Sequence, residues 1–548
     1  MSKQSRPGMA NSISTRSAVK QRLQKQRRRR VWGMLFVGSF GAILLGSLFF
    51  KPVLAPYAFS TQSPTRTVVN TPTLTPTAVV EAVVTSEPTI APTSTQVVIK
   101  SLPTQVQVIT YPKDTPILYY AQSGDSRDVL AVHFGVEVGE ISSTDFIPEQ
   151  GFIPPGQLLL IPSRLDEISS PLKLIPDTEV VNSPSTVDFD IKAFVEVAGG
   201  YLATYSEDLA STGRTSGAEI IARVSREYSV NPRLLLALLE YQGGWVYGTP
   251  ATQAVRDYAM NYISDERKGL FNQCAWAAGV ISDGYYGWRE GRVVAISFPD
   301  KTILRMAPDL NSGTVGLMNF FAQLNDPVQW GLALYDNASF ISLYNSMFGN
   351  PWLRAQQFEP LFSPAITQPE FILPIEAGKI WAFTGGPHAA WGVADVRAAL
   401  DFAPPSDEGG CVESPEWVLA VAPGLVVRSE YGAVVIDMDG DGYEQTGWNI
   451  VYMHIATKHR VPLGTVVAAG DRLGHPSCEG GRSTGTHMHI ARKFNGEWVP
   501  ADGPLAFNLA GWVTRAGAEN YTGWLIKDDR IIRANLAATY DSHIKVEP

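Results

Sequence analysis

The feature that most constrains this chain is an apolar run of twenty residues near its start, VWGMLFVGSFGAILLGSLFF at Val31–Phe50. A helix rises ~1.5 Å per residue, so this run can cross the hydrocarbon core of a membrane. Four arginines, Arg27–Arg30, come directly before it, and the positive-inside rule then keeps the N-terminus in the cytoplasm. We expect a basic cytoplasmic tail at 1–30, a single-pass transmembrane helix at 31–50 and extracytoplasmic domains after it. The alternative, a cleaved signal peptide, exports the same remainder.

The charge of the chain is distributed unevenly. The chain has 44 basic and 53 acidic side chains, and ten of the basic ones lie in residues 1–30, which leaves 34 against 53 and a net charge of −19 for the rest. An exported part this acidic repels phosphate backbones, so we expect no nucleic-acid partner. The length of 548 residues predicts two to four folded domains.

Two segments have the composition of connectors. Residues 51–110 are rich in Thr, Pro, Val and Ser and have no aromatic residue between Ser60 and Thr110. Such a sequence buries too little apolar surface to offset its chain entropy, so we expect a disordered linker. The Ser-Pro-Ser-Thr sequence at 183–186 predicts a second, short hinge between two domains.

Residues 111–163 predict a small βαβ unit. An apolar strand is followed by a Ser-Gly-Asp turn at 123–125, by a helix with Val129, Leu130, Ala131 and Phe134 inward, and by the apolar strand LLLIP. These motifs, together with Pro-Gly-Gln at 155–157, resemble the lysin-motif (LysM) domain. The resemblance implies binding of the glycan strands of peptidoglycan, although an inert spacer is the alternative. His133 lies on the helix and is predicted to be a structural or surface residue.

Residues 189–355 show helical periodicity and predict an all-α domain. The sequences NPRLLLALLEYQGGW and GTVGLMNFFAQL resemble the lysozyme-like fold of lytic transglycosylases. The position that matches the family's catalytic glutamate is Gln242, an amide, which cannot supply the proton for glycosidic cleavage. Glu240 lies two residues earlier and points elsewhere on a helix. We therefore expect this domain to be non-catalytic, and glycan cleavage through a displaced acid is the alternative.

Residues 371–548 consist of short apolar runs between Gly and Asp turns, which predicts a mainly antiparallel β domain. Six of the eight histidines of the chain lie between His388 and His489. Clustered histidines in an exported, acidic protein indicate a metal or acid–base site. In STGTHMH, residues 483–489, His487 and His489 are two apart and face the same side of a strand.

Five residues of this region together predict a zinc centre. We expect His388 in a GGPH loop, Asp401 in a short strand and His489 to bind Zn²⁺ with one position open for a water of pKa about 7. His454, from another strand, and His487 are then the catalytic non-ligands, which take up a proton and stabilise the tetrahedral oxyanion. The other histidines, His459, His475 and His543, are predicted to be ordinary surface or core residues.

The combination of GGPH, ALDF, the YMH strand and STGTHMH resembles the lysostaphin and β-lytic metalloendopeptidase family over about 371–515. The common family pattern has a histidine four residues before the aspartate, where this chain has Arg397. His388 instead fits the β-lytic arrangement, in which the first histidine lies farther upstream. The resemblance implies hydrolysis of peptide bonds in peptidoglycan stems or cross-bridges.

The remaining predictions concern cysteines and a second cation. In an oxidising compartment Cys411 and Cys478 are expected to form a disulfide, with Cys274 left as a buried thiol. Three aspartates begin like a calcium loop, but the twelfth position is Trp448 rather than Glu, so an ordinary turn is favoured over calcium. These aspartates are Asp437, Asp439 and Asp441.

The sequence as a whole predicts a membrane-anchored zinc endopeptidase on the cell-wall side, bound to peptidoglycan glycan through the LysM domain. The alternative from a different class is a non-catalytic scaffold that binds the wall and activates other hydrolases.

Overall fold

The computed structural model of the protein describes residues 115–392 and 396–547. The predicted basic tail, membrane anchor and linker, which together span residues 1–110, lie outside these described residues. Within the described ranges, no helix is both long and apolar enough to cross a membrane.

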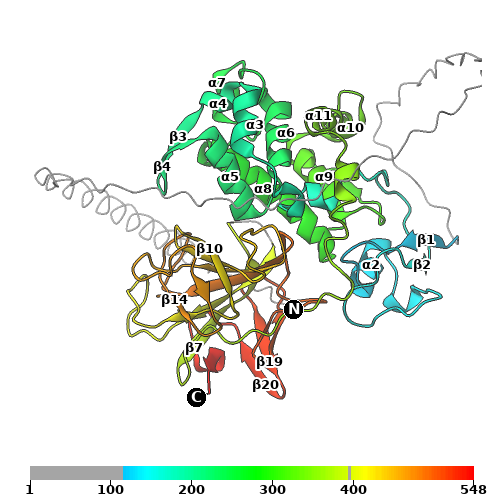
Figure 1. The fold of residues 1–548 in the computed structure, drawn as a ribbon. Coiled ribbons are helices and arrows are strands. Elements are labelled where there is room, and N and C mark those ends of the chain that lie inside the picture. Colours follow the sequence, from blue (N-terminus) through cyan, green and yellow to red (C-terminus); the bar gives the residue numbers. More distant parts are fainter. Residues whose placement is uncertain (1–114, 393–395, 548) are drawn as a thin grey trace, which may run out of the picture. The chain divides into compact units, whose positions relative to one another are not determined.

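The first folded region has the strand–helix–strand order expected of a βαβ unit (Figure 1). Its two strands are antiparallel, and its helix ends at Gly135, whose φ of 65° is the left-handed conformation that glycine adopts without strain. Leu130 and Phe134, four residues apart, are buried, and the Phe134 ring lies 5.2 Å from the Tyr119 ring. The elements are β1 (Ile117–Tyr120), α2 (Arg127–Phe134), η1 (Val138–Glu140) and β2 (Leu158–Ile161).

His133 on α2 has the structural role predicted for it. Its ring stacks on Trp288 with a centroid separation of 3.7 Å, and its Nε2 lies 3.0 Å from the Trp288 carbonyl oxygen. Burial lowers the pKa of His133 to about 3, so the imidazole is neutral at physiological pH.

The predicted hinge at residues 183–186 is wrong. Pro184–Thr186 form a 3₁₀ helix, η3, and Ser183, Ser185 and Thr186 are buried. The hydroxyl groups of Ser183 and Ser185 both donate to the Thr178 carbonyl oxygen, at 2.8 and 3.1 Å. A Ser/Pro composition is typical of linkers, but here the hydroxyls satisfy buried backbone acceptors and the segment packs into the helical region.

The central region is mainly helical, and its longest helices begin and end at recognisable signals. In α6, Asn231 caps the first turn by accepting from the Arg233 N–H at 2.9 Å, and Gly244 ends the helix with a φ of 62°. The helices are η2 (Asp177–Glu179), α3 (Ile191–Ala198), α4 (Tyr201–Thr204), α5 (Gly217–Tyr228), α6 (Pro232–Gly243), α7 (Gln253–Asp257), η4 (Asp265–Arg267), α8 (Leu270–Arg289), α9 (Ser312–Leu324), α10 (Pro327–Tyr335), α11 (Phe340–Phe348) and α12 (Pro351–Ala355).

The central region is not all-α, which corrects the prediction. It contains two antiparallel hairpins, formed by β3 (Ser206–Leu209) with β4 (Gly213–Ser216) and by β5 (Ala295–Ser297) with β6 (Ile303–Arg305). Strands of three or four residues are too short to show the alternation of apolar and polar residues by which a strand is recognised in a sequence.

The C-terminal region is antiparallel throughout its described strand pairs, as predicted. Its main sheet has the order β13-β10-β11-β12-β15-β8-β7-β21, with β16 paired to β15. Two smaller sheets are formed by β9 with β14 and by β17 to β20. The strands of the whole region are β7 (Ile380–Ala389), β8 (Arg397–Ala403), β9 (Val418–Leu419), β10 (Gly424–Glu430), β11 (Ala433–Asp437), β12 (Trp448–Met453), β13 (Val466–Val467), β14 (Arg472–Gly474), β15 (Met488–Phe494), β16 (Glu497–Trp498), β17 (Asn508–Leu509), β18 (Trp512–Ala516), β19 (Gly523–Lys527), β20 (Arg530–Arg533) and β21 (His543–Lys545), and the 3₁₀ helix η5 (Tyr540–Ser542) directly precedes β21.

The two faces of the main sheet contribute to different cores, because successive residues of a strand point to opposite sides. Leu400 of β8 and Ile490 of β15 belong to the core of the β region. Their neighbours Ala399 and Ala491 instead pack with the buried side chains of the helical region. The odd-numbered residues of β8 and β15, including those of the site, therefore lie on the face toward the helices.

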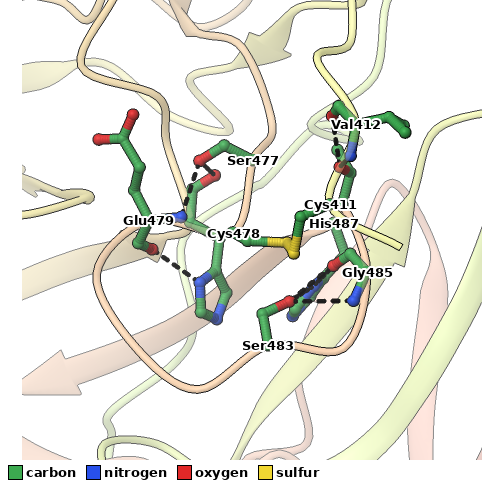
Figure 2. The surroundings of a disulfide bond; sticks show 10 residues. Cys411, Val412, Ser477, Cys478, Glu479, Ser483, Gly485 and His487 are labelled. Carbon is green, nitrogen blue, oxygen red and sulfur yellow. Dashed lines mark hydrogen bonds between the residues drawn. A yellow bond between two sulfur atoms is a disulfide. The ribbon is translucent and has the colours of Figure 1, made fainter. Parts of the chain in front are cut away.

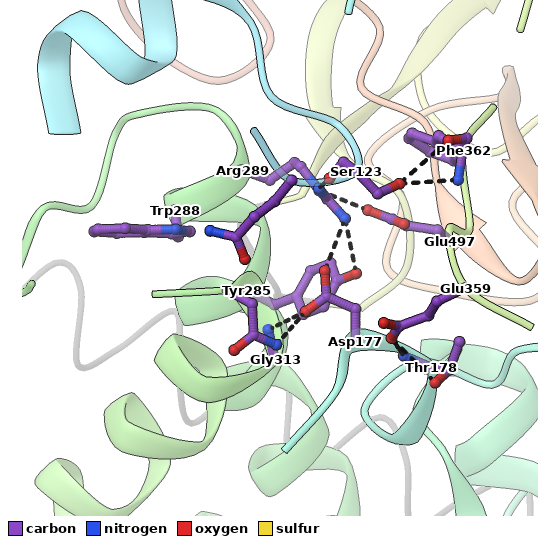
Figure 3. Close-up of polar contacts among 12 residues, drawn as sticks. Ser123, Asp177, Thr178, Tyr285, Trp288, Arg289, Gly313, Glu359, Phe362 and Glu497 are labelled. Atoms are coloured by element: carbon purple, nitrogen blue, oxygen red, sulfur yellow. Dashed lines mark hydrogen bonds and ion pairs between the residues drawn. The ribbon is translucent and has the colours of Figure 1, made fainter. Parts of the chain in front are cut away.

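Arg289 at the end of α8 connects all three regions (Figure 3). The Nη2 of this buried guanidinium lies 3.2 Å from the Asp177 carboxylate, and its Nε lies 2.9 Å from the Glu497 carboxylate. A third contact is a hydrogen bond to the Ser123 carbonyl oxygen in the Ser-Gly-Asp turn. Burial raises the pKa of Glu497 to about 7 in spite of this ion pair. The Ser-Gly-Asp turn of the LysM-like motif therefore contacts the helical region of the same chain.

Candidate metal centre

Three neighbouring strands bring His388, Asp401 and His489 together. His489 of β15 lies opposite Asp401 of β8, and Asp401 in turn lies opposite Gly385 of β7. His388 is near the end of β7, so the predicted loop position is wrong. The pairing of β7 with β8 shifts register between Gly385 and His388, and this irregularity turns the His388 side chain into the site.

The three candidate ligand atoms form a small triangle. His388 Nε2 lies 3.2 Å from Asp401 Oδ1 and 3.1 Å from His489 Nδ1, and His489 Nδ1 lies 3.3 Å from Asp401 Oδ1. Tetrahedral bonds of ~2.0–2.1 Å place two zinc ligands roughly 3.3 Å apart. Two imidazole nitrogens and one carboxylate oxygen also match the donor set of open zinc sites, so the residues fit a zinc ion.

The outer nitrogen of each imidazole is fixed by a backbone carbonyl. His388 Nδ1 donates to the Gly386 oxygen at 2.8 Å, and His489 Nε2 donates to the Ala390 oxygen at 3.1 Å. The inner nitrogens therefore carry lone pairs directed at the centre of the triangle. Asp401 Oδ1 is buried and accepts no hydrogen bond from the described residues. A buried carboxylate oxygen without a hydrogen-bond donor is rare in folded proteins, and a bound cation would supply the missing partner.

Burial and mutual charge interactions shift the pKa values of the three side chains of the triangle. Burial opposes a charge on His388, but the Asp401 carboxylate outweighs burial and raises the pKa of this imidazole. Burial also favours neutral Asp401, yet His388 and His489 hold its pKa well below the usual value. Burial lowers the pKa of His489. A proton on His388 and a divalent cation would therefore compete for the same position beside the ionised carboxylate.

The two glycines before His388 are required by close contacts. A Cβ on Gly385 would lie 2.5 Å from Asp401 Oδ2, and a Cβ on Gly386 would lie 2.5 Å from the Thr522 carbonyl oxygen. Atoms never approach so closely without displacement, so any side chain at Gly385 would push the carboxylate away. This explains why the sequence has Gly-Gly ahead of Pro387 and His388.

His454 and His487 lie beside the triangle. Their ring centroids are 4.4 Å apart, and His487 Nε2 lies 3.7 Å from Asp401 Oδ1. Both imidazoles donate through Nδ1 to a backbone carbonyl, His454 to Glu479 and His487 to Gly485, each at 2.8 Å. Burial, helped by His487 and His489, lowers the pKa of His454 to about 3. An imidazole that donates through Nδ1 in this way presents Nε2 as its second nitrogen.

The structure thus brings together all five residues that the sequence singles out, while their individual roles stay predictions. Sequence reasoning missed Tyr521, whose ring stacks on His388 at 4.2 Å. Tyr521 has a φ of 67°, and its N–H and carbonyl bond to the Pro387–Gly386 segment. No pattern in GAENYTGW indicates that this turn meets the GGPH segment.

The predicted disulfide is confirmed, with Cys411 and Cys478 bridged and Cys274 buried as a thiol (Figure 2). Of the other histidines, His459 and His543 are exposed, and His475 packs against Trp417. None of these three joins the triangle.

The aspartate cluster after β11 behaves as a turn. Asp437, Asp439 and Asp441 each place one carboxylate oxygen within 4.8 Å of the others. The Asp437 carboxylate, however, accepts from the backbone N–H groups of Asp439, Gly440 and Gly442 at 2.8–3.3 Å. These hydrogen bonds are the ones that an Asp-rich turn requires, and they favour the turn over calcium.

Glu240 in the helical region also has a structural use. Its carboxylate accepts from the Val246 and Tyr247 N–H groups, at 2.8 and 3.0 Å, directly after the end of α6. One oxygen of this carboxylate, Oε2, is therefore bonded to the loop that follows its own helix.

Comparison with known proteins finds similarity in both the helical and the β region. Residues 173–361 match the family described as LasA, N-terminal domain. The protease LasA of Pseudomonas aeruginosa is 24% identical over 319 residues, which cover 56% of this chain and 72% of that protein. The β-lytic metalloendopeptidase of Lysobacter enzymogenes is 27% identical over 150 residues, 27% of this chain and 80% of that protein.

Among solved structures, the M23 metalloprotease pseudoalterin is 24% identical and covers 31% of this chain and 96% of its own, with a TM-score of 0.26. The catalytic domain of lysostaphin from Staphylococcus simulans is 22% identical and covers 22% of this chain and 87% of its own, with a TM-score of 0.16. The chain is thus similar to LasA-like and β-lytic metallopeptidases. The LysM and lysozyme-like resemblances stay predictions.

Proposed function

We propose that this protein is a zinc endopeptidase that hydrolyses peptide bonds in the stems or cross-bridges of peptidoglycan. The observation that carries the proposal is the triangle of His388 Nε2, Asp401 Oδ1 and His489 Nδ1, with separations of 3.1–3.3 Å. The similarity of the chain to a protease and to a metalloendopeptidase supports peptide hydrolysis as the reaction. The peptidoglycan substrate rests on the sequence resemblance to the lysostaphin and β-lytic family.

In this proposal His388, Asp401 and His489 hold the metal ion and leave one coordination position open. Zinc there supplies the Lewis acidity that makes a water nucleophilic near neutral pH. Asp401 is ionised, so two neutral imidazoles and one carboxylate leave the centre with a net positive charge. That charge would stabilise the oxyanion that develops when the scissile carbonyl is attacked.

His454 and His487 are proposed to act on the reacting groups without binding the metal. Each keeps its Nδ1–H on a backbone carbonyl and therefore offers Nε2 as a base toward the same space. One imidazole would take the proton of the attacking water on its Nε2. An imidazole protonated in this way carries an Nε2–H that can donate to the oxyanion developing on the scissile carbonyl. Their rings are adjacent, with centroids 4.4 Å apart, so both imidazoles can act on neighbouring atoms of one substrate group.

The same proposal places the enzyme at the cell-wall side of the membrane. Residues 31–50 would anchor it, and residues 111–163 would bind glycan as a LysM domain. Both the anchor and the glycan-binding role rest on the sequence alone. The anchor lies outside the described residues, and the Ser-Gly-Asp turn of the LysM-like region makes its described contact with Arg289 of the same chain.

The test is digestion of purified peptidoglycan by the full-length chain, with and without a chelator, beside the His489→Ala variant. We expect chelator-sensitive release of peptides that the variant cannot produce. If both proteins leave the wall intact while still binding to it, the scaffold that activates other hydrolases becomes the better description.

A further inference from the structure

The disulfide between Cys411 and Cys478 joins the two loops that hold the non-ligand histidines (Figure 2). On one side, the residues that flank Cys478 both contact His454. The Ser477 N–H and hydroxyl donate to the His454 carbonyl oxygen at 2.6 and 3.0 Å, and the Glu479 carbonyl oxygen accepts from His454 Nδ1 at 2.8 Å. The backbone and the ring of His454 are thus both fixed by the neighbours of one cysteine.

On the other side, the residues that flank Cys411 both contact Thr486, the residue before His487. The Thr486 N–H donates to the Gly410 carbonyl oxygen at 3.0 Å. The Val412 N–H donates to Thr486 Oγ1 at 2.9 Å, and that hydroxyl donates back to the Val412 carbonyl oxygen at 2.5 Å. The backbone entering His487 is therefore held by the neighbours of the second cysteine.

The segments that meet at this bridge lie outside the main sheet and are otherwise held by isolated contacts, such as the His487 N–H, which donates to the Ser477 carbonyl oxygen at 3.3 Å. Gly480, Gly481 and Gly485 lie between Cys478 and His487, and glycines leave a loop with many accessible conformations. His454 itself has a φ of 63°, a left-handed conformation that persists in a non-glycine residue only when its surroundings impose it. The Glu479 carboxylate, which accepts from the Thr457 N–H at 2.9 Å, is a second anchor for the loop.

The three metal ligands are supported differently. His388, Asp401 and His489 lie on strands β7, β8 and β15, which pair along several residues in the middle of the main sheet. The hydrogen bonds to their imidazoles come from Gly386 and Ala390, which are remote from both cysteines in sequence. Opening the bridge therefore leaves the supports of the triangle in place.

We propose that the Cys411–Cys478 disulfide is a positioning element that holds His454 and His487 against the metal centre, so that its reduction lowers turnover but leaves the metal bound. The inference rests on the proposed catalytic roles of these two histidines. It predicts that catalysis by this protein requires an oxidising compartment, although neither cysteine touches substrate or metal.

The test uses the oxidised full-length chain loaded with zinc and a water-soluble phosphine, which converts the disulfide to two thiols while it is oxidised to the phosphine oxide with oxygen from water. A displacement of about 1 Å in a reacting group can lower turnover 100-fold, so we expect kcat to fall roughly 10- to 100-fold. KM and bound zinc, measured by atomic spectroscopy, should stay within about twofold, and reoxidation should restore kcat.

Hydrogen exchange followed by mass spectrometry gives a readout that does not depend on activity. On reduction, amides in residues 454–458 and 474–487 should exchange faster, whereas those in 380–390, 397–403 and 488–494 should not change. The Cys411→Ser/Cys478→Ser variant should reproduce both results, and Cys274→Ser, which removes a thiol outside the site, should reproduce neither.

Three results decide the matter. Unchanged exchange and unchanged kcat after reduction overturn the proposal, and so does loss of zinc together with kcat, because the bridge would then support the whole site. If the oxidised chain binds zinc but cleaves nothing, the proposed function fails. The positioning claim is then judged by exchange and zinc content alone, which keeps the two failures distinct.

Discussion

The helical region and the β region each contain a carboxylate that is a candidate for catalysis or metal binding. The two carboxylates differ in the groups that they contact. Glu240 accepts from two backbone N–H groups at the end of its helix. Asp401 Oδ1 is buried without a hydrogen-bond donor among the described residues, while imidazole nitrogens lie 3.2–3.7 Å away. A carboxylate whose hydrogen bonds come from the fold itself has a structural role. A buried carboxylate oxygen without such hydrogen bonds, toward which several imidazoles point, indicates a site for a bound ion.

A second difference separates the residues of the site itself. The metal ligands belong to paired strands in the middle of the sheet, whereas His454 and His487 belong to the ends of strands and to loops. Strands fix side chains by register, and loops need additional links to reach similar precision. We therefore expect perturbations of the two groups to separate metal binding from turnover.

The largest expected effect comes from the triangle. His489→Ala and Asp401→Asn should each remove bound zinc and lower kcat/KM by roughly 10⁴-fold or more, because the nucleophile and the carbonyl both lose the metal. Zinc content and the release of peptides from peptidoglycan measure the two effects. Asp441→Asn, which changes an exposed carboxylate in the aspartate turn, is the matched control and should keep both. A variant of Asp401 that loses no zinc would remove Asp401 from the ligand set.

The second effect concerns the histidine pair. His454→Ala and His487→Ala should each lower kcat by roughly 10²- to 10⁴-fold, the usual range for a lost acid–base or oxyanion group, with zinc retained. Steady-state kinetics beside a zinc assay measures this separation. His459→Ala, an exposed imidazole, serves as the control. Loss of zinc from either variant would show that the histidine is a ligand, contrary to the division of roles drawn here.

The third effect concerns the close contact of Gly385. In Gly385→Ala the new Cβ would meet Asp401 Oδ2 at 2.5 Å, so the carboxylate must move. We expect zinc affinity to fall roughly 10- to 100-fold, as for other disturbances of the groups that orient a ligand. Competition with a chromophoric chelator measures it. Gly331→Ala, at a position with no atom within 4 Å of the new Cβ, should bind zinc normally. Equal zinc affinities in the Gly385→Ala and Gly331→Ala variants would show that a side chain at position 385 does not displace the Asp401 carboxylate.

The fourth effect is the pH dependence of metal binding. The pKa of His388 is raised above 6.5, and that of Asp401 is far below 3.8, so the carboxylate stays ionised and the imidazole titrates. A proton on His388 competes with the metal, so affinity should fall about tenfold per pH unit below the His388 pKa. The affinity of the His388→Ala variant should be weak and less dependent on pH. Affinity that instead rises on acidification would contradict this competition.

The smallest effect is expected in the helical region. Glu240→Gln keeps a carbonyl acceptor for the loop after α6 and should change peptidoglycan cleavage by less than about twofold. Analysis of the products for new reducing or anhydro sugar ends tests the same point. Sugar ends that disappear in this variant would show that the helical region cleaves glycan after all.

Much of the site was predictable because it depends on local spacing. The two-residue interval of His487 and His489 and the short apolar strand around Asp401 are visible in the sequence alone. The expectation that His487 shares the strand of His489 is wrong, because β15 begins at Met488 and His487 lies just before it. The position of His388 was less accessible, since its strand is interrupted by glycines whose need arises from atoms of Asp401 and Thr522. Tyr521 could not be found, because its contact joins two segments more than a hundred residues apart.

The errors in the predicted fold have a similar origin. The segment 183–186 has the composition of a hinge, and only its contacts with Thr178 reveal a buried turn. The two hairpins of the helical region are held by backbone pairing over three or four residues, which leaves no periodic signal in the side chains.

We propose that the β region holds a zinc centre that cuts peptide bonds in the wall. Mass spectrometry of the fragments that the full-length chain releases from purified peptidoglycan tests it most directly. We predict fragments with new peptide amino and carboxyl ends and intact glycan, formed with zinc and absent after chelation or in Asp401→Asn. Fragments that form equally well with chelator and in that variant, or that carry only new sugar ends, would contradict the claim.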